Sequence, residues 1–577
     1  MREISVADYF VEFLIAQGVT DVFGYQGGMI AYIFDSLGRY SDRINYHSCA
    51  TEQGAALAAC GYAQASGKLG VAISTSGPGF TNLLTGMANA WFDSVPVMFV
   101  SGNVNTKDKK REKPLRQLGF QEIQACEMSR TIAKKTYEIE LDTDYKKCFE
   151  EAYVTAMSDR KGPVYLDLPI NACREHIEMD VTNSITINRC SAETQVDYII
   201  KKLCECKKPV IIAGAGIKQA GCISEFRKLI EMLMIPVITT LPAIDVLPTD
   251  SRYTMGYIGG TARREAGIAL QNADFVLSMG TRLCSKQIGH NLTLFAPKAK
   301  EFIRIDIDKN EFCRKIKDNE KDICADLRLV IQQLIAGISA GRYKAQTDKW
   351  INSCNDMREL LMNQDITIMN EFYHELTDML PDNANIIFDV GKNLIYGGQS
   401  SIIKSNTEVY MSAGLGAMGY AIPAAIGVSL GNKNRKTYVF TGDGGAQMNI
   451  QELNTIIKSG LKIKIIVLNN NALGNIRSFQ KQYLDSRFIA TEADKGDYYS
   501  CDFSAIARAY GLESNVINIK EIKRYKEQLL SDISGLLEIV YDDCPTLPGI
   551  VAGGEFLNED NGIDSEIISE IKNVMYD

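Results

Sequence analysis

The chain has 577 residues, and its 46% hydrophobic content is that of an ordinary globular protein with room for several domains. Its net charge of -9 argues against a general nucleic-acid-binding protein, and no apolar run is long enough to span a membrane. The fifteen cysteines are scattered without zinc-site spacing, so we expect reduced thiols and a cytoplasmic location.

Apolar runs alternate with helical patterns from the N-terminus to about residue 169. The first stretch predicts an amphipathic helix rather than a signal peptide, because Asp8 and Glu12 interrupt its apolar residues. The candidate strands that follow are 21–24, 44–47, 70–74, 95–101 and 163–168. This rhythm predicts a mostly parallel sheet with helices on both faces.

The same plan occurs twice more along the chain. The candidate strands of the second unit are 209–213, 235–239, 274–279 and 302–307, and those of the third are 385–389, 408–412, 437–441, 463–468 and about 537–541. The polar stretches 170–196 and 340–365 predict linkers. We therefore predict an α/β fold of three doubly wound parallel-sheet domains, at 1–172, 190–340 and 366–550. An acidic tail at 551–577 is expected to be loosely ordered or to fold over a site.

The stretch 437–472 predicts a strand–turn–helix–strand unit with polar residues at the carboxyl ends of two strands. The turn is Gly442-Asp443-Gly444-Gly445, and the second strand ends at Asn470. In the helix between them, Asn449 takes the N-cap position and Glu452 completes a capping box. A carboxylate and an amide oxygen suit Mg²⁺, and the glycines let the backbone approach a phosphate. Taken alone, Gly-Asp-Gly is more often a tight turn; the full order of elements favours the phosphate site.

A second group of polar residues follows the strands of the first unit. Glu52 opens an alanine-rich helix, where a carboxylate also has a plain structural role at the positive end of the helix dipole. Two glycine loops, 24–28 and 75–82, follow neighbouring strands. The alternative interpretation is that their glycines only form turns that end regular secondary structure. The loop residues that enter the prediction are Gly27, Ser76, Gly77 and Asn82.

Taken together, these motifs resemble a known family. The segments GDGG…NN, TEQGA, TSGPGFTN, AWFDSVPV, GFQE, SAGLGAMGYAIPAAIG and IDID are similar to those of thiamine diphosphate enzymes, above all the catalytic subunit of acetohydroxyacid synthase, also called acetolactate synthase. The match spans about Asp8 to Asp542. It implies a pyrimidine-binding first domain, a Rossmann-like central domain with a candidate FAD or nucleotide site, and a diphosphate- and Mg²⁺-binding third domain.

The resemblance also implies an activity, which is decarboxylation of a 2-keto acid such as pyruvate and carboligation to a second carbonyl. Two alternatives stay open. One is the same chemistry with another acceptor, such as a nucleotide-linked keto sugar, and the other is a non-catalytic paralogue. We expect a homodimer or homotetramer with sites shared between subunits, and a regulatory small subunit stays open. The sequence indicates neither a nucleic-acid nor a membrane partner.

By the same resemblance, Asp443, Asn470 and the carbonyl of Ala472 are expected to hold Mg²⁺ against the cofactor diphosphate. Glu52 is expected to come from the partner subunit and to share a proton with the aminopyrimidine ring. The protein would supply position and a dry cavity, while the cofactor acts as the electron sink. The residues expected along the cofactor are Gly27, Glu52, Ser76, Gly77, Asn82, Val390, Gly391, Lys392, Asn393, Gly416, Met418, Gly442, Asp443, Gly444, Gly445, Asn470, Ala472, Leu473 and Gly474.

Gln121 and Lys134 join Glu52 as the expected catalytic residues. Lys134 also has the plain interpretation of a solvated surface charge, and Met418 that of a core methionine. The expected substrate pocket consists of Phe120, Gln121, Lys286, Asn475 and Phe479.

The predicted pocket departs from the family pattern at several positions. Asn475 and Phe479 stand where the family has methionine and tryptophan, and Lys286 stands where it has arginine. Lys392-Asn393 replaces the usual Gln-His of the diphosphate loop. Changes in an apolar pocket alter discrimination by about 1–3 kcal/mol, so the sequence does not predict the acceptor or a preference for 2-ketobutyrate.

The central segment matches the family's FAD pattern only in part, and FAD binding stays open. Gly260-Thr261-Ala262 replaces the usual Met-His-Gly, and Cys284-Ser285 replaces an acidic pair. The matching residues are Arg130, Gly214, Gly216, Thr240, Leu241, Gly280, Arg282, Asp306 and Ile307.

Overall fold

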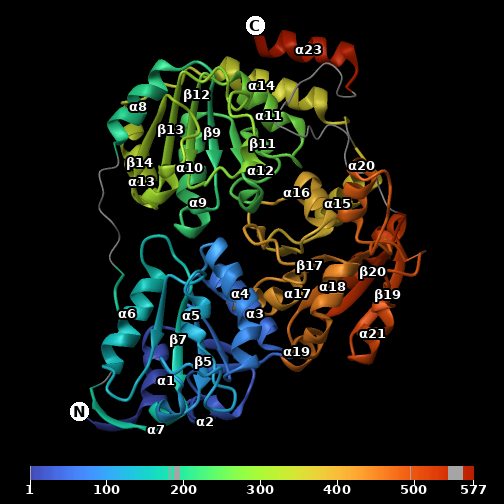
Figure 1. The fold of residues 1–577 in the computed structure, drawn as a ribbon. Helices are drawn as coiled ribbons and strands as arrows, with labels where there is room; N and C mark the ends of the chain where they lie inside the picture. Colours follow the sequence, from blue (N-terminus) through green and yellow to red (C-terminus); the bar gives the residue numbers. More distant parts are fainter. Residues whose placement is uncertain are drawn as a thin grey trace.

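The computed structural model describes residues 2–180, 183–187, 195–364, 366–493, 495–542 and 563–576. These residues form three α/β units, which Figure 1 shows in blue, green and orange, each with helices packed around a six-stranded parallel sheet. The predicted fold class is confirmed by this arrangement. No helix in these ranges is both long and apolar enough to cross a membrane.

In the first domain the strands lie in the order β3-β2-β4-β5-β7-β6. They are β2 (Asp21–Gly24), β3 (Asn45–Ser48), β4 (Gly70–Ser74), β5 (Val97–Asn103), β6 (Lys135–Glu138) and β7 (Val164–Pro169). The helices are α1 (Val6–Ala16), α2 (Ala31–Arg39), α3 (Glu52–Ser66), α4 (Pro78–Phe92), α5 (Ala125–Ser129), α6 (Tyr145–Met157) and α7 (Ile170–Arg174). Since all neighbouring strands are parallel, the loops that follow them meet at one edge of the sheet.

The linker predicted at 170–196 is wrong in its first part. It begins with α7, and β8 (His176–Met179) then pairs antiparallel with β1 (Arg2–Ser5). This ribbon ties the N-terminus to the end of the first domain through backbone hydrogen bonds, which polar residues form as readily as apolar ones. Residues 181–182 and 188–194 of the predicted linker lie outside the described residues.

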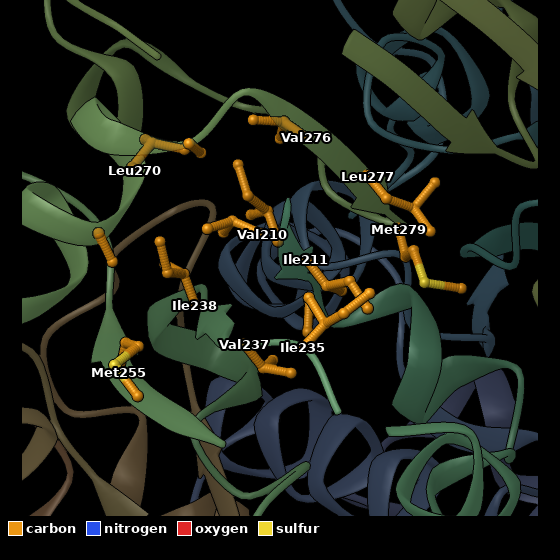
Figure 2. Close-up of a cluster of buried hydrophobic side chains, with 14 of the residues drawn as sticks. Val210, Ile211, Ile235, Val237, Ile238, Met255, Leu270, Val276, Leu277 and Met279 are labelled. Atoms are coloured by element: carbon orange, nitrogen blue, oxygen red, sulfur yellow. The ribbon is translucent and has the colours of Figure 1, made fainter. Parts of the chain in front are cut away.

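In the central domain the strand order is β11-β10-β9-β12-β13-β14, the 3-2-1-4-5-6 order of dinucleotide-binding folds. The strands are β9 (Pro209–Ala213), β10 (Val237–Thr239), β11 (Thr254–Tyr257), β12 (Phe275–Met279), β13 (Glu301–Asp306) and β14 (Glu320–Cys324). The helices are α8 (Val196–Glu205), α9 (Gly216–Gln219), α10 (Ile223–Leu233), α11 (Arg264–Asn272), α12 (Ser285–Ile288), α13 (Leu327–Ser339) and α14 (Asp348–Leu361). Figure 2 shows part of its core, where Val210, Ile211, Val237, Ile238, Val276 and Leu277 come from three neighbouring strands.

The second predicted linker, 340–365, is also wrong, because most of it is α14. The helix is polar on average but buries Trp350, Ile351 and Met357 along one face. Figure 1 shows α23 (Ser565–Tyr576) beside α14, and Ile568, Ile571 and Met575 of α23 belong to the core of the central domain. The tail predicted at 551–577 therefore ends in a packed helix, while 551–562 and 577 lie outside the described residues.

The third domain has the strand order β16-β15-β17-β18-β20-β19. Its strands are β15 (Asn385–Phe388), β16 (Glu408–Met411), β17 (Thr437–Gly442), β18 (Ile463–Asn469), β19 (Glu513–Asn518) and β20 (Gly535–Val540). The helices are α15 (Ile368–Met379), α16 (Lys392–Ser400), α17 (Ala421–Gly431), α18 (Asp443–Met448), α19 (Leu453–Lys458), α20 (Gly474–Tyr483), α21 (Phe503–Ala509) and α22 (Lys526–Leu530).

The first and third domains share one hydrophobic core, built around α3 and α17. The two helices approach at backbone distance, since a Cβ on Gly427 would lie 1.8 Å from the carbonyl oxygen of Ala58. Small residues along both helices permit this approach. The packing fixes the Glu52 end of α3 relative to the third domain of the same chain.

Candidate cofactor site

Asp443 lies where the sequence places it, directly after β17 at the carboxyl edge of the third sheet. Its side chain is only 3% exposed, Oδ1 accepts a hydrogen bond from Gly444 N at 2.9 Å, and Oδ2 has no hydrogen-bond partner in the described part of the chain. Burial raises the pKa of this carboxyl to about 6, although Tyr498, Ala472 N and Ser500 face it and lower the pKa in part. A buried carboxylate oxygen without a donor fits a cation ligand.

The loop that follows β18 brings Ala472 to the same place. The backbone between Asn470 and Ala472 turns through Asn471, whose φ of 54° lies in the left-handed region. Ala472 forms an isolated antiparallel bridge with Glu492, and Leu473 N donates to Thr491 O at 3.1 Å. These contacts fix the loop that carries Asn470 and Ala472, and the carbonyl of Ala472 also accepts from Gly474 N at 2.8 Å. An amide oxygen and a backbone carbonyl oxygen are of the chemical kind that a hard cation binds.

The glycine turn is surrounded by other residues of the predicted site. A Cβ on Gly444 would lie 2.6 Å from Leu473 Cδ2, 3.2 Å from Met418 Cε and 3.4 Å from the Tyr498 hydroxyl. The structure therefore brings together Met418, Gly444 and Leu473, which the sequence predicted from three separate segments. Tyr498 was not predicted, because nothing in its local sequence marks it.

Asn449 and Glu452 do not form the predicted capping box. The helix begins earlier, at Asp443, and Asn449 interrupts it: its Nδ2 donates to Gly419 O at 2.8 Å. The carboxylate of Glu452 instead accepts from Ala50 N and Thr51 N, both at 3.1 Å. The reason is tertiary packing, since α3 of the first domain presents unpaired N–H groups at its start, directly opposite Glu452.

Glu52 is the first residue of α3, and its environment matches the predicted pyrimidine site. Thr51 caps the helix by accepting from Gly54 N at 3.0 Å, and Asn82 Nδ2 donates to Glu52 Oε2 at 3.0 Å. A Cβ on Gly79 would lie 3.4 Å from Glu52 Oε1. The loop at 75–82 and Glu52, predicted separately, thus lie side by side.

Gln121 meets the same loop from the other side. A Cβ on Gly77 would lie 3.1 Å from Gln121 Cβ, and Gly77 has a φ of 59°, which favours glycine. Gln121 itself has a φ of 63°, a strained conformation for a side-chain-bearing residue that is typical of functional sites. Its neighbour Phe120 is 79% exposed. Ser76 Oγ is buried without a hydrogen-bond partner in the described ranges, and Gly27 contacts the same loop through Thr75.

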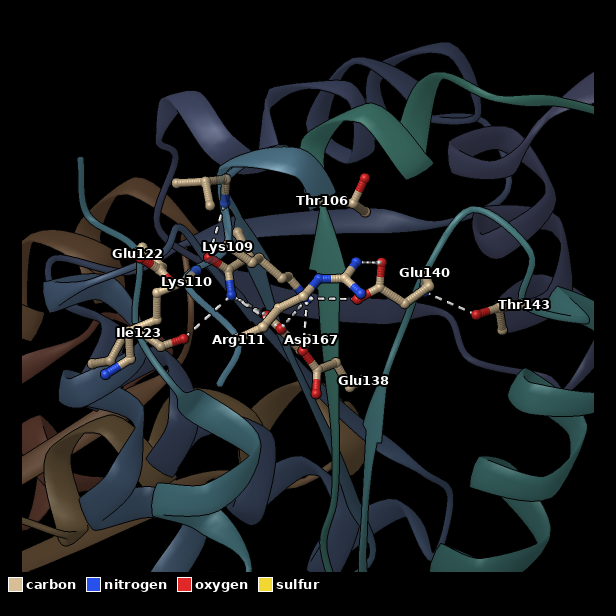
Figure 3. A network of polar contacts seen from close by, with 12 residues as sticks. Thr106, Lys109, Lys110, Arg111, Glu122, Ile123, Glu138, Glu140, Thr143 and Asp167 are labelled. Carbon is tan, nitrogen blue, oxygen red and sulfur yellow. Dashed lines mark hydrogen bonds and ion pairs between the residues drawn. The ribbon is translucent and has the colours of Figure 1, made fainter. Parts of the chain in front are cut away.

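A buried ion pair anchors the segment that carries Phe120 and Gln121, as Figure 3 shows. Lys109 Nζ lies 3.0 Å from Asp167 Oδ2 and 3.1 Å from Glu138 Oε1, and Asn103 Nδ2 donates to both oxygens of Asp167. Burial lowers the pKa of Lys109, but the two carboxylates raise it by more.

Within the same segment the carboxylate of Glu122 holds a turn closed. It accepts hydrogen bonds from the backbone of Lys110, Leu118 and Gly119. Hydrogen bonds within the loop thus hold the backbone next to Gln121 in place. No local pattern in the sequence predicted this bracing, because its partners are separated by up to twelve residues.

The diphosphate loop at 390–393 is organised by Asp389, which the sequence prediction treated only as a strand end. Asp389 Oδ1 accepts from Val390 N at 2.7 Å and Gly419 N at 2.9 Å, and Oδ2 accepts from Thr441 Oγ1 at 3.2 Å and Ala421 N at 3.3 Å. Burial raises the pKa of Asp389 to about 6. One carboxylate thus connects its own loop to the start of α17 and to the end of β17, and its position after β15 was the signal that could have identified it.

Lys392 and Asn393 open α16 at this edge, and both are buried. Asn393 Nδ2 donates to Asp389 O at 2.7 Å and Phe440 O at 3.0 Å, so this amide group organises the loop. A direct contact of Asn393 with a phosphate stays a prediction. The predicted glycines at this edge also include Gly442 and Gly445. Another is Gly416, which has a φ of 71° and where a Cβ would have open space.

Four further predicted residues, one catalytic and three of the substrate pocket, lie outside the loops described above. Lys134 Nζ donates to Ser158 O at 3.0 Å, and burial lowers its pKa. Lys286 is an exposed residue of α12 in the central domain. Phe479 lies on α20, is about half exposed and contacts the ring of Tyr483, while Asn475 is exposed one turn earlier. Their roles stay predictions.

The FAD residues lie around the carboxyl edge of the central sheet, at the point where the strand order reverses. There the loops after β9 and β12 touch: Gly216 N donates to Gly280 O at 3.0 Å, and a Cβ on Gly214 would lie 2.0 Å from the same oxygen. Leu241 packs against Gly398 of the third domain.

Two charged residues of the FAD pattern interact within the protein. Asp306 Oδ1 accepts from Asp308 N, and Arg282 lies near enough to Asp93 to lower the pKa of that carboxyl. Arg130, the third charged residue, is exposed on the first domain. FAD binding stays a prediction, and we assign it no step.

Comparisons with known proteins agree with the geometry of the first and third domains. Three family models match: "Thiamine pyrophosphate enzyme, N-terminal TPP binding domain" at residues 4–128, the central domain of the same enzymes at 196–334, and their C-terminal TPP binding domain at 389–536. The matches follow the three structural units in order. They confirm the resemblance drawn from the motifs.

Several curated relatives match over almost their whole length. A probable acetolactate synthase large subunit of Methanocaldococcus jannaschii is 32% identical over 96% of this chain and 94% of its own. An acetolactate synthase large subunit of Lactococcus lactis is 31% identical over 92% and 89%, and the acetolactate synthase isozyme 2 large subunit of Escherichia coli is 30% identical over 96% and 99%. The chain therefore belongs to the acetolactate synthase large-subunit family of thiamine pyrophosphate enzymes.

Proposed function

We propose that this protein decarboxylates pyruvate with thiamine diphosphate and Mg²⁺ and joins the remaining two-carbon unit to a second pyruvate, giving acetolactate. The observation that carries the proposal is the buried Asp443 carboxylate, whose Oδ2 has no hydrogen-bond donor among the described residues. The next residue, Gly444, lies against Met418 and Leu473. Acetolactate synthases among the relatives support the choice of reaction.

The protein's own residues have separable tasks in this proposal. Asp443, the Asn470 amide and the Ala472 carbonyl hold Mg²⁺, which in turn binds the cofactor diphosphate. Glu52, oriented by Asn82, holds or moves a proton at the aminopyrimidine ring. When bound, the cofactor supplies the electron sink for decarboxylation.

Purified protein tests this directly. We expect CO₂ release from pyruvate that requires thiamine diphosphate and Mg²⁺, with acetolactate as the product. Glu52→Gln should abolish turnover while leaving cofactor binding largely intact, because the amide keeps the shape but cannot carry the proton. Unchanged turnover in this variant would refute the assigned role of Glu52. If the wild type did not turn over pyruvate, pyruvate would be ruled out as the substrate.

A second candidate keeps the chemistry and changes the acceptor. Asn475 and Phe479, which replace the family's methionine and tryptophan, are exposed on α20 and favour a larger or more polar acceptor carbonyl, such as a keto sugar on a nucleotide. CO₂ release from pyruvate with little acetolactate, but with consumption of an added keto sugar, would favour this candidate.

We further propose that two subunits share each site, with Glu52 from one and Asp443 from the other, in a homodimer or homotetramer. Co-expression of a Glu52→Gln chain with an Asp443→Ala chain tests the sharing. Each mixed dimer would contain one intact site, so random pairing should restore about a quarter of wild-type activity. Sites built within single chains would restore none.

Three further proposals concern a partner subunit, FAD and the cellular location. A small-subunit partner is supported by relatives named as large subunits. An absorption spectrum of the purified protein tests FAD, for which the contacts around Asp306 and Gly280 give little support. The cytoplasmic location stays a prediction.

A further inference from the structure

The loop from Ser412 to Gly419, which carries Gly416 and Met418, is held from outside its own domain. Asp93, directly after α4 of the first domain, accepts from Gly414 N through Oδ1 at 2.7 Å and from Ala413 N through Oδ2 at 3.2 Å. Both carboxylate oxygens of this half-buried side chain thus accept from two successive amides of the loop.

A second contact from α4 acts on the same loop. Asn89 Oδ1 accepts from the Ser412 hydroxyl at 2.6 Å, and Ser412 Oγ in turn accepts from Gly416 N at 3.1 Å and Ala417 N at 3.0 Å. The end of α4 therefore fixes the backbone directly before Met418 through a chain of hydrogen bonds.

The central domain meets this junction as well. Gln219 Nε2 donates to the backbone oxygen of Asp93 at 2.8 Å. Burial raises the pKa of the Asp93 carboxyl to about 6, and the amides of Gly414 and Ala413 and the charge of Arg282 lower it in part. Asp93 thus stands where all three domains meet, and its carboxylate accepts hydrogen bonds from the loop of the third domain.

We propose that Asp93 is a positioning residue that holds the Ala413–Met418 loop in the shape needed to place Gly416 and Met418 against thiamine diphosphate. The inference rests on the proposed function only for the location of the cofactor. Its physical basis is that removal of the carboxylate leaves two loop amides without acceptors, which frees the loop to move or to admit water.

The test compares Asp93→Ala and Asp93→Asn with Asp274→Ala. Asp274 is the matched control, because its carboxylate also accepts from two successive backbone amides, Lys207 N at 2.9 Å and Lys208 N at 2.8 Å, but in the central domain. Thiamine diphosphate binding with Mg²⁺ is measured by titration calorimetry, together with the circular dichroism of the bound cofactor and the thermal unfolding of each variant.

For Asp93→Ala we expect thiamine diphosphate affinity to fall about tenfold or more, with an altered cofactor dichroism. A tenfold loss corresponds to about 1.4 kcal/mol, no more than the loss of one hydrogen bond to a charged group. Asp93→Asn, which keeps one acceptor, should fall between Asp93→Ala and the wild type. Asp274→Ala should lower the unfolding temperature with cofactor affinity and dichroism unchanged.

Wild-type affinity and dichroism in Asp93→Ala, or the same loss in Asp274→Ala, would overturn the proposal, since either result reduces Asp93 to a general stabilising contact. Cofactor binding is measured without pyruvate. A wild type that binds thiamine diphosphate but does not turn over pyruvate would therefore refute the proposed reaction and leave the test of Asp93 intact.

Discussion

At the scale of single residues, Glu452 shows how one side chain connects two parts of the candidate site. It is fully buried in the third domain, yet its carboxylate accepts from Ala50 N and Thr51 N, directly before the helix that begins with Glu52. Thr455 Oγ1 also donates to it at 2.7 Å. The orientation of Glu52 therefore depends on a residue only nine positions after Asp443.

Gly54 is the position that tests this contact. A Cβ at Gly54 would lie 1.9 Å from Glu452 Oε1, so Gly54→Ala must displace a buried, hydrogen-bonded carboxylate. We expect a loss of about 2–3 kcal/mol in the free energy of unfolding and a fall in turnover, because the lost hydrogen bonds involve a charged group. Denaturant unfolding and the turnover rate provide the measurements.

Gly38→Ala is the matched control, since Gly38 is exposed in α2 and a Cβ there would have open space. This change should stabilise the protein by about 0.5–1 kcal/mol through helix propensity. Equal behaviour of the two variants would contradict the role assigned to Gly54.

Asp306 gives a prediction on pH. Burial raises the pKa of its carboxyl to about 6, with Arg160 lowering the pKa and Glu311 and Asp308 raising it. The folded state therefore binds this proton more tightly than the unfolded state, so the stability contributed by Asp306 falls as pH rises from about 4 to about 6.

Asp306→Asn keeps the oxygen that accepts from Asp308 N and removes the titration. We expect the unfolding free energy of the wild type, relative to this variant, to decrease by about 2–3 kcal/mol across that range of pH, at about 1.4 kcal/mol per pKa unit. A difference between the two proteins that does not change with pH would show that Asp306 has an ordinary pKa.

At the scale of elements, the loop between β5 and α5 depends on the ion pair of Lys109 and Asp167. Lys109→Met leaves the Asp167 carboxylate buried without its cation, which typically costs about 3–5 kcal/mol. We expect this loss in denaturant unfolding, together with a raised KM for pyruvate, because the same loop carries Phe120 and Gln121. An unchanged KM despite lower stability would show that this ion pair stabilises the fold without affecting the candidate site.

Lys135→Met is the control for this loop. Lys135 also pairs with a carboxylate, that of Glu151, but both side chains are about half exposed. An exposed pair is worth about 0–1 kcal/mol, so stability should hardly change.

Within the three six-stranded sheets, the strands that sequence analysis missed share one feature. They are β6, β11, β14 and β19, and each lies at an edge of its sheet. An edge strand needs apolar residues on fewer sides than a central strand, so its sequence carries a weaker periodic signal. The central strands, by contrast, are buried on both faces, and their continuous apolar runs predicted them to within one or two residues.

At the scale of the whole molecule, the chain returns from the third domain to cover the central one with α23. Ile571 of this helix is almost fully buried, whereas the neighbouring Glu570 is exposed. We expect Ile571→Ala to lower stability by about 2–5 kcal/mol through the cavity that it creates, and Glu570→Ala to change it by less than about 0.5 kcal/mol.

Thermal unfolding with and without thiamine diphosphate provides the measurement for α23. Cofactor affinity should stay constant in both variants, because α23 packs on the central domain. Equal stability of the two variants would show that α23 does not contribute to the core.

The sequence by itself determined the three α/β units, their order and the residues at the carboxyl edges of the central strands, because apolar periodicity and glycine turns are local signals. Asp443 was identifiable in this way, whereas Glu52 and Met418 were identified through the resemblance to the family. Only the tertiary structure showed that Glu452 accepts from another domain, that Asp389 connects three segments and that Asp93 accepts from Gly414 N. A buried carboxylate takes its partners from whatever backbone amides packing places beside it, and that choice is not written in the neighbouring sequence.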